Sequence, residues 1–159
     1  MKFSGMLMVV KNMDVSRTFY QQVLRRTVVM DLDTYVVFEG FCLITEPQWA
    51  EFQTRTDLVY RYGNNVCELA FEEEEFDEFV AHFRTFPDIE IMCELREYEW
   101  GQRSPRFYDP DRHVVEVGED MKTVTKRFLR SGMTVEQTTE KTMFPKEFVE
   151  MCREEMKGE

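Results

Sequence analysis

Few side chains in this sequence could act as metal ligands or nucleophiles. It has two histidines, and its four cysteines are widely spaced without a C-x-x-C pair, so zinc-ribbon and thioredoxin-type sites are not expected. His82 lies among phenylalanines on a predicted helix and is assigned a structural or exposed role. His113 and Glu116 are three residues apart on a predicted strand, and this odd separation places them on opposite faces. A surface role is therefore predicted for His113.

Acidic and aromatic residues form two further groups. Four glutamates, Glu72 to Glu75, could bind a cation, but carboxylates favour a helix N-terminus, and a solvated helix entrance is the preferred interpretation. Tyr98, Trp100 and Phe107 lie near a predicted hairpin and could line an aromatic pocket for a flat ligand. Ordinary core or dimer packing explains these three residues equally well, so both interpretations stay open.

Length and composition predict one compact domain. The chain has 159 residues, 43% of them hydrophobic, with only 5 prolines and 7 glycines. Its formal net charge of −11 disfavours nucleic acid and anionic membranes as partners. No apolar run approaches the roughly 18 residues of a membrane span, and no signal peptide is recognised. Free thiols in a reducing cytoplasm are the expected state of the cysteines.

Hydrophobic periodicity predicts the same order of elements twice, a strand, a helix and three strands. In the first half, Val15, Phe19 and Val23 recur at the spacing of one helix face. The predicted ranges there are 3–10, 12–25, 27–32, 35–38 and 41–45. In the second half they are 66–71, 76–83, 90–97, 103–108 and 113–117. The stretch 46–63 is interpreted as a connection, in which Pro47 could begin a short helix.

From residue 120 onward the pattern is helical. Gly132 is placed to end one helix, Thr134 and Gln137 have capping-box spacing for a second, and Pro145 begins a third. The last segment faintly resembles a helix-turn-helix, but its glutamates are unsuited to a recognition helix, so no nucleic-acid partner is expected. Packing on the domain or on a second subunit is the preferred role.

Three motifs carry a family resemblance. The first is an acidic helix cap followed by Phe-Tyr and Val-Leu at 12–24, and the second is Glu-Leu-Ala-Phe at 68–71. The third is Phe-Tyr-Asp-Pro-Asp-Arg-His-Val-Val-Glu at 107–116. In order and spacing they resemble the vicinal oxygen chelate superfamily, which includes glyoxalase, bleomycin-resistance and extradiol dioxygenase proteins.

The resemblance implies an α+β fold in which two βαβββ modules form a cupped mixed sheet around a pocket. The implied domain covers residues 1–119, with halves at about 1–46 and 64–119. Residues 120–159 would be a C-terminal helical extension packed on the domain or on the dimer partner. A homodimer is also implied.

The resemblance also implies where a metal would bind. Enzymes of the superfamily commonly hold a divalent ion with histidine and glutamate. The last ligand falls on Glu116, the second-half ligand at about Glu68, and the first-strand histidine at or near Gly5, which cannot ligate. Two carboxylates without an imidazole suit zinc or nickel poorly, whereas weak Mg²⁺ or Mn²⁺ binding stays open.

Two functional hypotheses follow. In the first, the protein binds a small organic molecule, has a degenerate metal site and needs no cofactor. In the second, it is a metal-dependent lyase, isomerase or dioxygenase-type enzyme, in which Glu68 and Glu116 bind Mg²⁺, Mn²⁺, Ni²⁺ or Zn²⁺ or act as an acid–base pair. Whether the protein is an enzyme is left open, and the sequence does not name the ligand.

Overall fold

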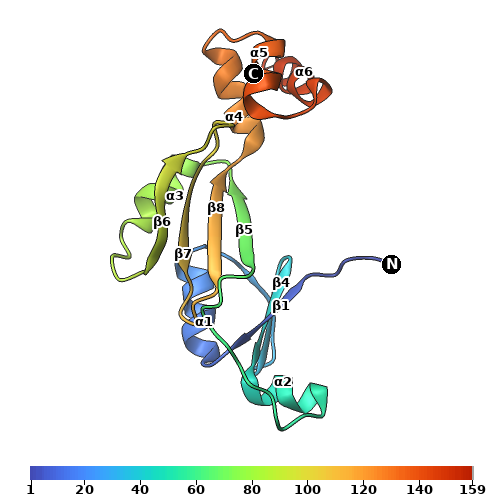
Figure 1. Cartoon of the computed structure of the whole chain (residues 1–159), viewed down its shortest axis with the longest axis vertical. Coiled ribbons are helices and arrows are strands. Elements are labelled where there is room, and N and C mark those ends of the chain that lie inside the picture. The colour runs from blue at the N-terminus through green and yellow to red at the C-terminus, as the bar shows by residue number, and fades with distance from the viewer. Residues whose placement is uncertain (159) are drawn as a thin grey trace. The chain divides into compact units, whose positions relative to one another are not determined.

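A computed structural model describes residues 1–158. It has two four-stranded sheets (Figure 1). In each, a helix follows the first strand, and three further helices follow the last strand of the second sheet. This confirms the predicted α+β class with two βαβββ modules. The chain divides into two compact units. The first unit comprises residues 1–67, 86–89 and 108–114, and the second comprises residues 68–85, 90–107 and 115–159.

The first unit contains the first module. Its elements are β1 (Met6–Val10), α1 (Met13–Gln22), β2 (Val28–Asp31), β3 (Tyr35–Phe38) and β4 (Phe41–Thr45). The sheet order is β1-β4-β3-β2, with β1 parallel to β4 and the other pairs antiparallel. Helix α1 begins where predicted, because the side chain of Asn12 accepts a hydrogen bond from the backbone N–H of Val15 at 3.1 Å.

Aromatic packing between α1 and the first sheet forms the core of this unit. The rings of Phe38 and Phe41 stack with centroids 4.8 Å apart, and the ring of Tyr20 lies 5.0 Å from that of Phe41. All three side chains are buried. Each such burial stabilises the fold by roughly 1.5–3 kcal/mol, so these few contacts fix α1 on the sheet.

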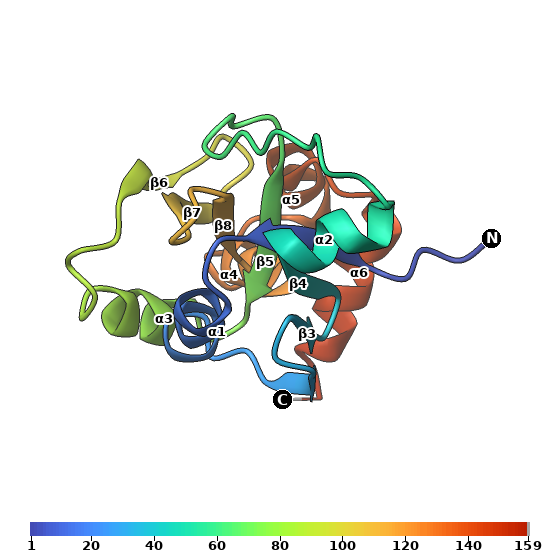
Figure 2. The same cartoon turned by 90° about the horizontal axis from the view of Figure 1, so that it is seen from below.

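The segment interpreted as a connection contains one more helix. Helix α2 (Glu46–Gln53) has Pro47 in its first turn and ends at Thr54, whose φ of 53° is left-handed. It packs beside β1 and β4 (Figure 2). The short helix that Pro47 could begin therefore exists, and the irregular connection is confined to the residues that follow it.

The second unit contains most of the second module. Its elements are β5 (Glu68–Glu73), α3 (Phe76–Phe83), β6 (Ile91–Glu97), β7 (Arg103–Tyr108) and β8 (Val114–Glu119), in the sheet order β5-β8-β7-β6. Helix α3 packs on one face of this sheet, where the rings of Phe83 and Phe107 are 4.5 Å apart. The acidic run at 72–75 leads from β5 into α3, which matches the interpretation of a solvated helix entrance.

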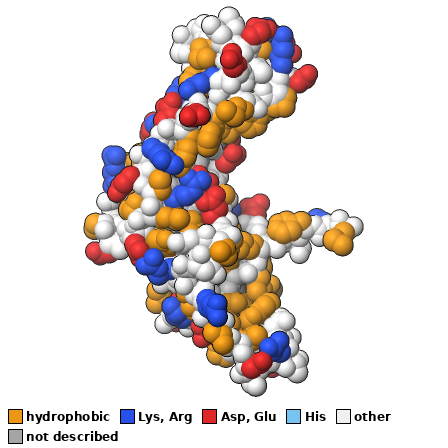
Figure 3. Space-filling view, viewed as in Figure 1, with side chains coloured by type: hydrophobic (Ala, Val, Ile, Leu, Met, Phe, Trp, Pro, Cys, Tyr) orange, Lys and Arg blue, Asp and Glu red, His pale blue; other side chains and the backbone are white. Residues whose placement is uncertain are grey.

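Three helices complete the second unit: α4 (Met121–Arg130), α5 (Val135–Thr142) and α6 (Lys146–Glu155). They gather beyond the end of β8 (Figure 1). The predicted capping box is present, since Thr134 and Gln137 exchange both hydrogen bonds. Acidic and basic side chains are interspersed on these helices (Figure 3), as in the ion pairs of Lys122 and Lys126 with Glu155. Within residues 1–158, none of the helices has the length and apolar character needed to span a membrane.

Gly101 shows how closely α4 packs on the turn between β6 and β7. It has a φ of +88°, and a Cβ added there would lie 2.3 Å from an atom of the Phe128 ring. Gly132 has a similar φ of +93° but open space around it. We expect Gly132→Ala to cost about 1 kcal/mol from backbone strain alone. Gly101→Ala should cost about 1–3 kcal/mol more, from the steric conflict with Phe128.

Urea denaturation of the two alanine variants measures this difference. Equal loss of stability in both variants would contradict the docking of α4 on the hairpin. A larger loss in Gly101→Ala would support the C-terminal helices as an integral part of the second unit.

Candidate functional site

The second sheet presents a face opposite α3 that carries the residues proposed from the sequence. Side chains alternate along a strand, and on β7 the side chains of Arg103 and Phe107 contact α3. Ser104 and Arg106 therefore point to the other face. We call this surface the Arg106 face and define it by Glu68 on β5, Ser104 and Arg106 on β7, and Glu116 on β8.

Arg106 brings the two predicted glutamates together. Its Nε donates to Glu68 at 2.8 Å, and its Nη2 lies 2.8 Å from Oε1 of Glu116. Ser104 donates a further hydrogen bond to Glu116 at 2.6 Å. The hydrogen bond with Glu68 raises the pKa of the guanidinium, outweighing the opposite effect of burial. The two glutamates and Arg106 thus form one ion-paired cluster.

Two of the three predicted aromatic residues lie beside this cluster. The Nη1 of Arg106 donates a hydrogen bond to the hydroxyl of Tyr98, and the rings of Tyr98 and Trp100 stack with centroids 4.7 Å apart. The indole N–H of Trp100 donates to Gln102 at 3.1 Å. Phe107 lies on the opposite face, fully buried against α3, so it belongs to the core of the second unit.

The donor set of the Arg106 face fits a divalent metal poorly. A guanidinium already holds both carboxylates, and a cation competing for them would have to displace it. Among residues 1–158 there is no group of three or more His, Cys, Asp or Glu side chains arranged to hold a metal ion. Both predicted metal ligands are therefore engaged by the guanidinium of Arg106.

The resemblance predicts a metal-ligand histidine at or near Gly5, where the backbone leaves little room for a side chain. Gly5 has a φ of +134°, and a Cβ there would lie 2.9 Å from the carbonyl oxygen of Gly40. Because that oxygen belongs to the backbone, a histidine at this position would require the strand to shift. A side chain at position 5 therefore conflicts with the backbone of Gly40.

Sequence reasoning missed Arg106 and misplaced His113. Arg106 could have been found from the alternation of β7, once Ser104 was assigned to the face of Glu116. His113 is not a surface residue of β8, which begins at Val114. Its side chain is 21% exposed, and its Nδ1 lies 2.8 Å from Oδ2 of the buried Asp109. His82 is half-buried on α3.

Comparison with known proteins gives a family model and several solved structures. The model described as a glyoxalase-like domain matches residues 3–122. A protein of unknown function from Agrobacterium tumefaciens is 33% identical over 76% of this chain and 94% of its own, with a TM-score of 0.69. No curated protein matches the chain.

Two further structures share the fold at lower identity. A glyoxalase/bleomycin resistance protein/dioxygenase from Nocardioides is 20% identical over 75% of this chain and 83% of its own, with a TM-score of 0.60. A lactoylglutathione lyase from Agrobacterium tumefaciens is 23% identical over 75% of this chain and 94% of its own, with a TM-score of 0.56.

Proposed function

Because the chain belongs to the glyoxalase-like family, we propose that it binds a small organic molecule on the Arg106 face, without a metal. The observation that supports this proposal is the bridging of Glu68 and Glu116 by Arg106. The guanidinium supplies the positive charge that a divalent ion supplies in a chelating enzyme. It cannot form coordination bonds to substrate oxygens as a metal does, however, and can only donate hydrogen bonds to them.

The chemistry of the face favours a neutral or cationic ligand with a flat body. Arg96 lies over the Tyr98 ring, 4.5 Å from its centroid, so the charges of the face nearly balance, and the exposed carboxylate of Glu68 is the group that would attract a cation. The stacked rings of Tyr98 and Trp100 offer an aromatic surface for a planar group or a cation. Glu68 is the more accessible carboxylate, with 36% of its side chain exposed against 14% for Glu116.

The metal-dependent lyase, isomerase or dioxygenase hypothesis is the weaker one. Both glutamates that it would use as metal ligands or as an acid–base pair are held by Arg106.

We also propose residues 1–119 as the glyoxalase-like domain, residues 120–159 as its helical extension, and a homodimer as the assembly. A cytoplasmic location, which the four free thiols favour, stays a prediction.

Ligand preference can be tested with three benzene derivatives of similar size: benzamidine, benzamide and benzoate. In a Trp49→Phe background only Trp100 emits, and its position beside Tyr98 makes it a reporter of binding. We expect a saturable change in emission with benzamidine and none with benzoate. Glu68→Gln should weaken benzamidine binding about tenfold, the effect of losing one charge-assisted contact.

Glu147→Gln, which removes an exposed carboxylate on α6, is the matched control and should leave the affinity unchanged. Equal responses to benzamidine and benzoate would contradict the charge argument. Unchanged benzamidine affinity in Glu68→Gln would place the ligand elsewhere.

Removing the arginine should turn the face into a weak metal site. In Arg106→Met the two carboxylates lose their shared partner, and we expect Mn²⁺ to bind with a Kd on the order of 10⁻⁴–10⁻³ M, as in weak carboxylate sites. Calorimetric titration of the wild type and the variant measures it. Adding Glu68→Gln and Glu116→Gln should abolish this binding.

Metal binding by the wild-type protein would instead support the enzyme hypothesis. Stoichiometric metal in wild-type protein purified without chelator, and its loss in Glu116→Ala, would mean that Glu116 is a metal ligand. Arg106 would then have to move away from the carboxylates when the ion binds.

A further inference from the structure

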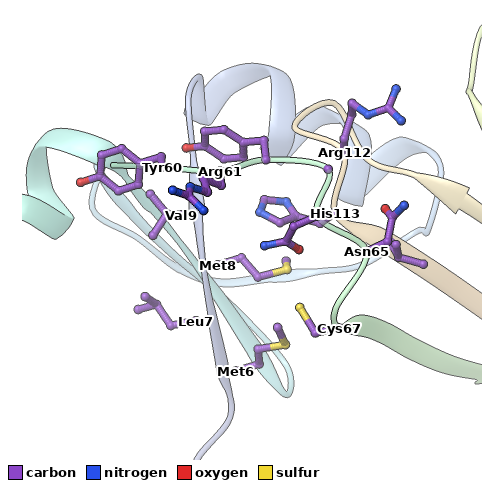
Figure 4. Close-up of a pocket in the computed structure, with 14 residues that line it drawn as sticks. Met6, Leu7, Met8, Val9, Tyr60, Arg61, Asn65, Cys67, Arg112 and His113 are labelled. Carbon is purple, nitrogen blue, oxygen red and sulfur yellow. The ribbon is translucent and has the colours of Figure 1, made fainter. Parts of the chain in front are cut away.

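The first unit contains a cavity of its own. It has a volume of about 240 Å³ and lies between β1, the segment 60–67 and residues 112–114 (Figure 4). Pockets for drug-sized ligands usually measure about 300–1,000 Å³, so this one suits a smaller molecule. None of the residues that form the Arg106 face lines it.

Most of the cavity wall is apolar or aromatic. Strand β1 contributes Met6 to Val9; in Figure 4 Met6 and Met8 point toward His113 and Cys67, and Leu7 and Val9 point to the other side of the strand. Tyr60 and Tyr62 stand on the connecting segment with their rings stacked 6.4 Å apart. The hydroxyl of Tyr62 donates to Glu46 at 2.7 Å, and this fixes the ring in place. The wall therefore favours a ligand with an apolar body.

The charges at the cavity are positive, although the whole chain has a net charge of −11. Arg61 and Arg112 line it, and within residues 1–158 no Asp or Glu side chain does. Arg112 lies over the Tyr108 ring, 4.4 Å from its centroid, and points away from His113 in Figure 4. The guanidinium of Arg61 has no hydrogen bond or ion pair to any described residue. Arg61 is thus available to pair with an anion.

His113 supplies a second polar group at the centre of the lining. Figure 4 shows its imidazole with Arg61 on one side and Asn65 on the other. Its Nδ1 lies 2.8 Å from Oδ2 of Asp109, which also accepts the hydroxyl of Tyr20 at 2.9 Å. A carboxylate can only accept, so Nδ1 carries the hydrogen and Nε2 is the ring nitrogen left for another partner.

Asp111 and Asp109, two of the acidic residues near this cavity, already have partners. Asp111 accepts hydrogen bonds from the hydroxyl of Ser16 and the backbone N–H of Lys11, and Lys11 forms an ion pair with it at 3.6 Å. Asp109 is buried and accepts the backbone N–H groups of Asp111 and His113. Their charges are therefore partly compensated before a ligand arrives.

We propose that this cavity binds a small organic anion with an apolar body, a monocarboxylate of about the size of benzoate. Arg61 pairs with the carboxylate, and β1 forms the apolar wall. The ligand charge is opposite to that favoured by the Arg106 face. The proposal stands independently of the function proposed for that face.

The test is a titration of ¹⁵N-labelled protein with benzoate, benzamide and benzamidine, followed by NMR. We expect benzoate to shift the backbone signals of residues 61–65 and 113 saturably, with a Kd on the order of 1 mM. Benzamide, which has the same shape without the charge, should bind at least about tenfold more weakly, as expected for loss of a charge-assisted contact. Benzamidine should not compete.

A matched pair of variants tests whether Arg61 is the cation that pairs with the benzoate carboxylate. Arg61→Gln should weaken benzoate binding about tenfold, whereas Arg25→Gln, which removes an exposed arginine elsewhere in the same unit, should have no effect. Because Arg61 has no hydrogen-bond or ion-pair partner within residues 1–158, its replacement should leave the unit folded. Equal binding of benzoate and benzamide, or an unchanged affinity in Arg61→Gln, would overturn the proposal.

Cys67 provides a second measurement, since it is exposed and lines the cavity. We expect bound benzoate to slow its alkylation by iodoacetamide, a neutral reagent, and benzamidine to leave the rate unchanged. The absence of both protection and signal shifts at about 10 mM benzoate, well above the expected Kd, would also overturn the proposal.

Discussion

Phe107→Ala should lower the free energy of unfolding of the second unit by about 3–5 kcal/mol, the usual cost of removing a buried phenylalanine. The side chain is fully buried, and its ring contacts that of Phe83 between β7 and α3. Its removal leaves a cavity that the sheet and the helix cannot close. Urea denaturation monitored by Trp100 in a Trp49→Phe background reports this unit.

The same variant separates a core role from a ligand-binding role. Phe52→Ala is the control, because that phenylalanine is 61% exposed and its loss should change stability by no more than about 0.5 kcal/mol. A small stability loss in Phe107→Ala combined with weaker ligand binding would instead restore Phe107 to the aromatic pocket considered from the sequence.

Asp109→Ala should destabilise the first unit by about 3 kcal/mol or more, because it leaves buried donors without an acceptor. The carboxylate accepts from the hydroxyl of Tyr20 and from the backbone N–H groups of Asp111 and His113 at 2.7–3.0 Å. Burial, with Asp109 as the next cause, raises the pKa of Tyr20 well above its usual value, so the hydroxyl keeps its proton. Unfolding monitored by Trp49 in a Trp100→Phe background measures the loss.

Tyr20→Phe is the matched control for this network. It removes one donor and leaves the other contacts of Asp109 in place, so its cost should be only about 1–2 kcal/mol. Equal costs for the two variants would contradict a network centred on the carboxylate.

The amino-acid sequence by itself determined the elements and the family. The bounds of β3, β4, β7 and α3 agree with the predicted ranges, because alternation, caps and turn residues act between neighbours a few positions apart. The motifs at 68–71 and 107–116 identified the family for the same reason, since each is a short local pattern. Element ends differed by one to three residues at β1, β5 and β8, where pairing with another strand sets the limit.

The partners of the predicted glutamates were decided only by the tertiary structure. Glu68 and Arg106 are 38 residues apart, and only the order β5-β8-β7 places them on one face with Glu116 between them. No local pattern encodes that strand order, so the sequence indicated two carboxylates but not the arginine that holds them. The cavity beside β1 arose in the same way, from a connecting segment and a hairpin turn that meet a distant strand. Chemistry at both places depends on long-range packing, which periodicity along the chain does not report.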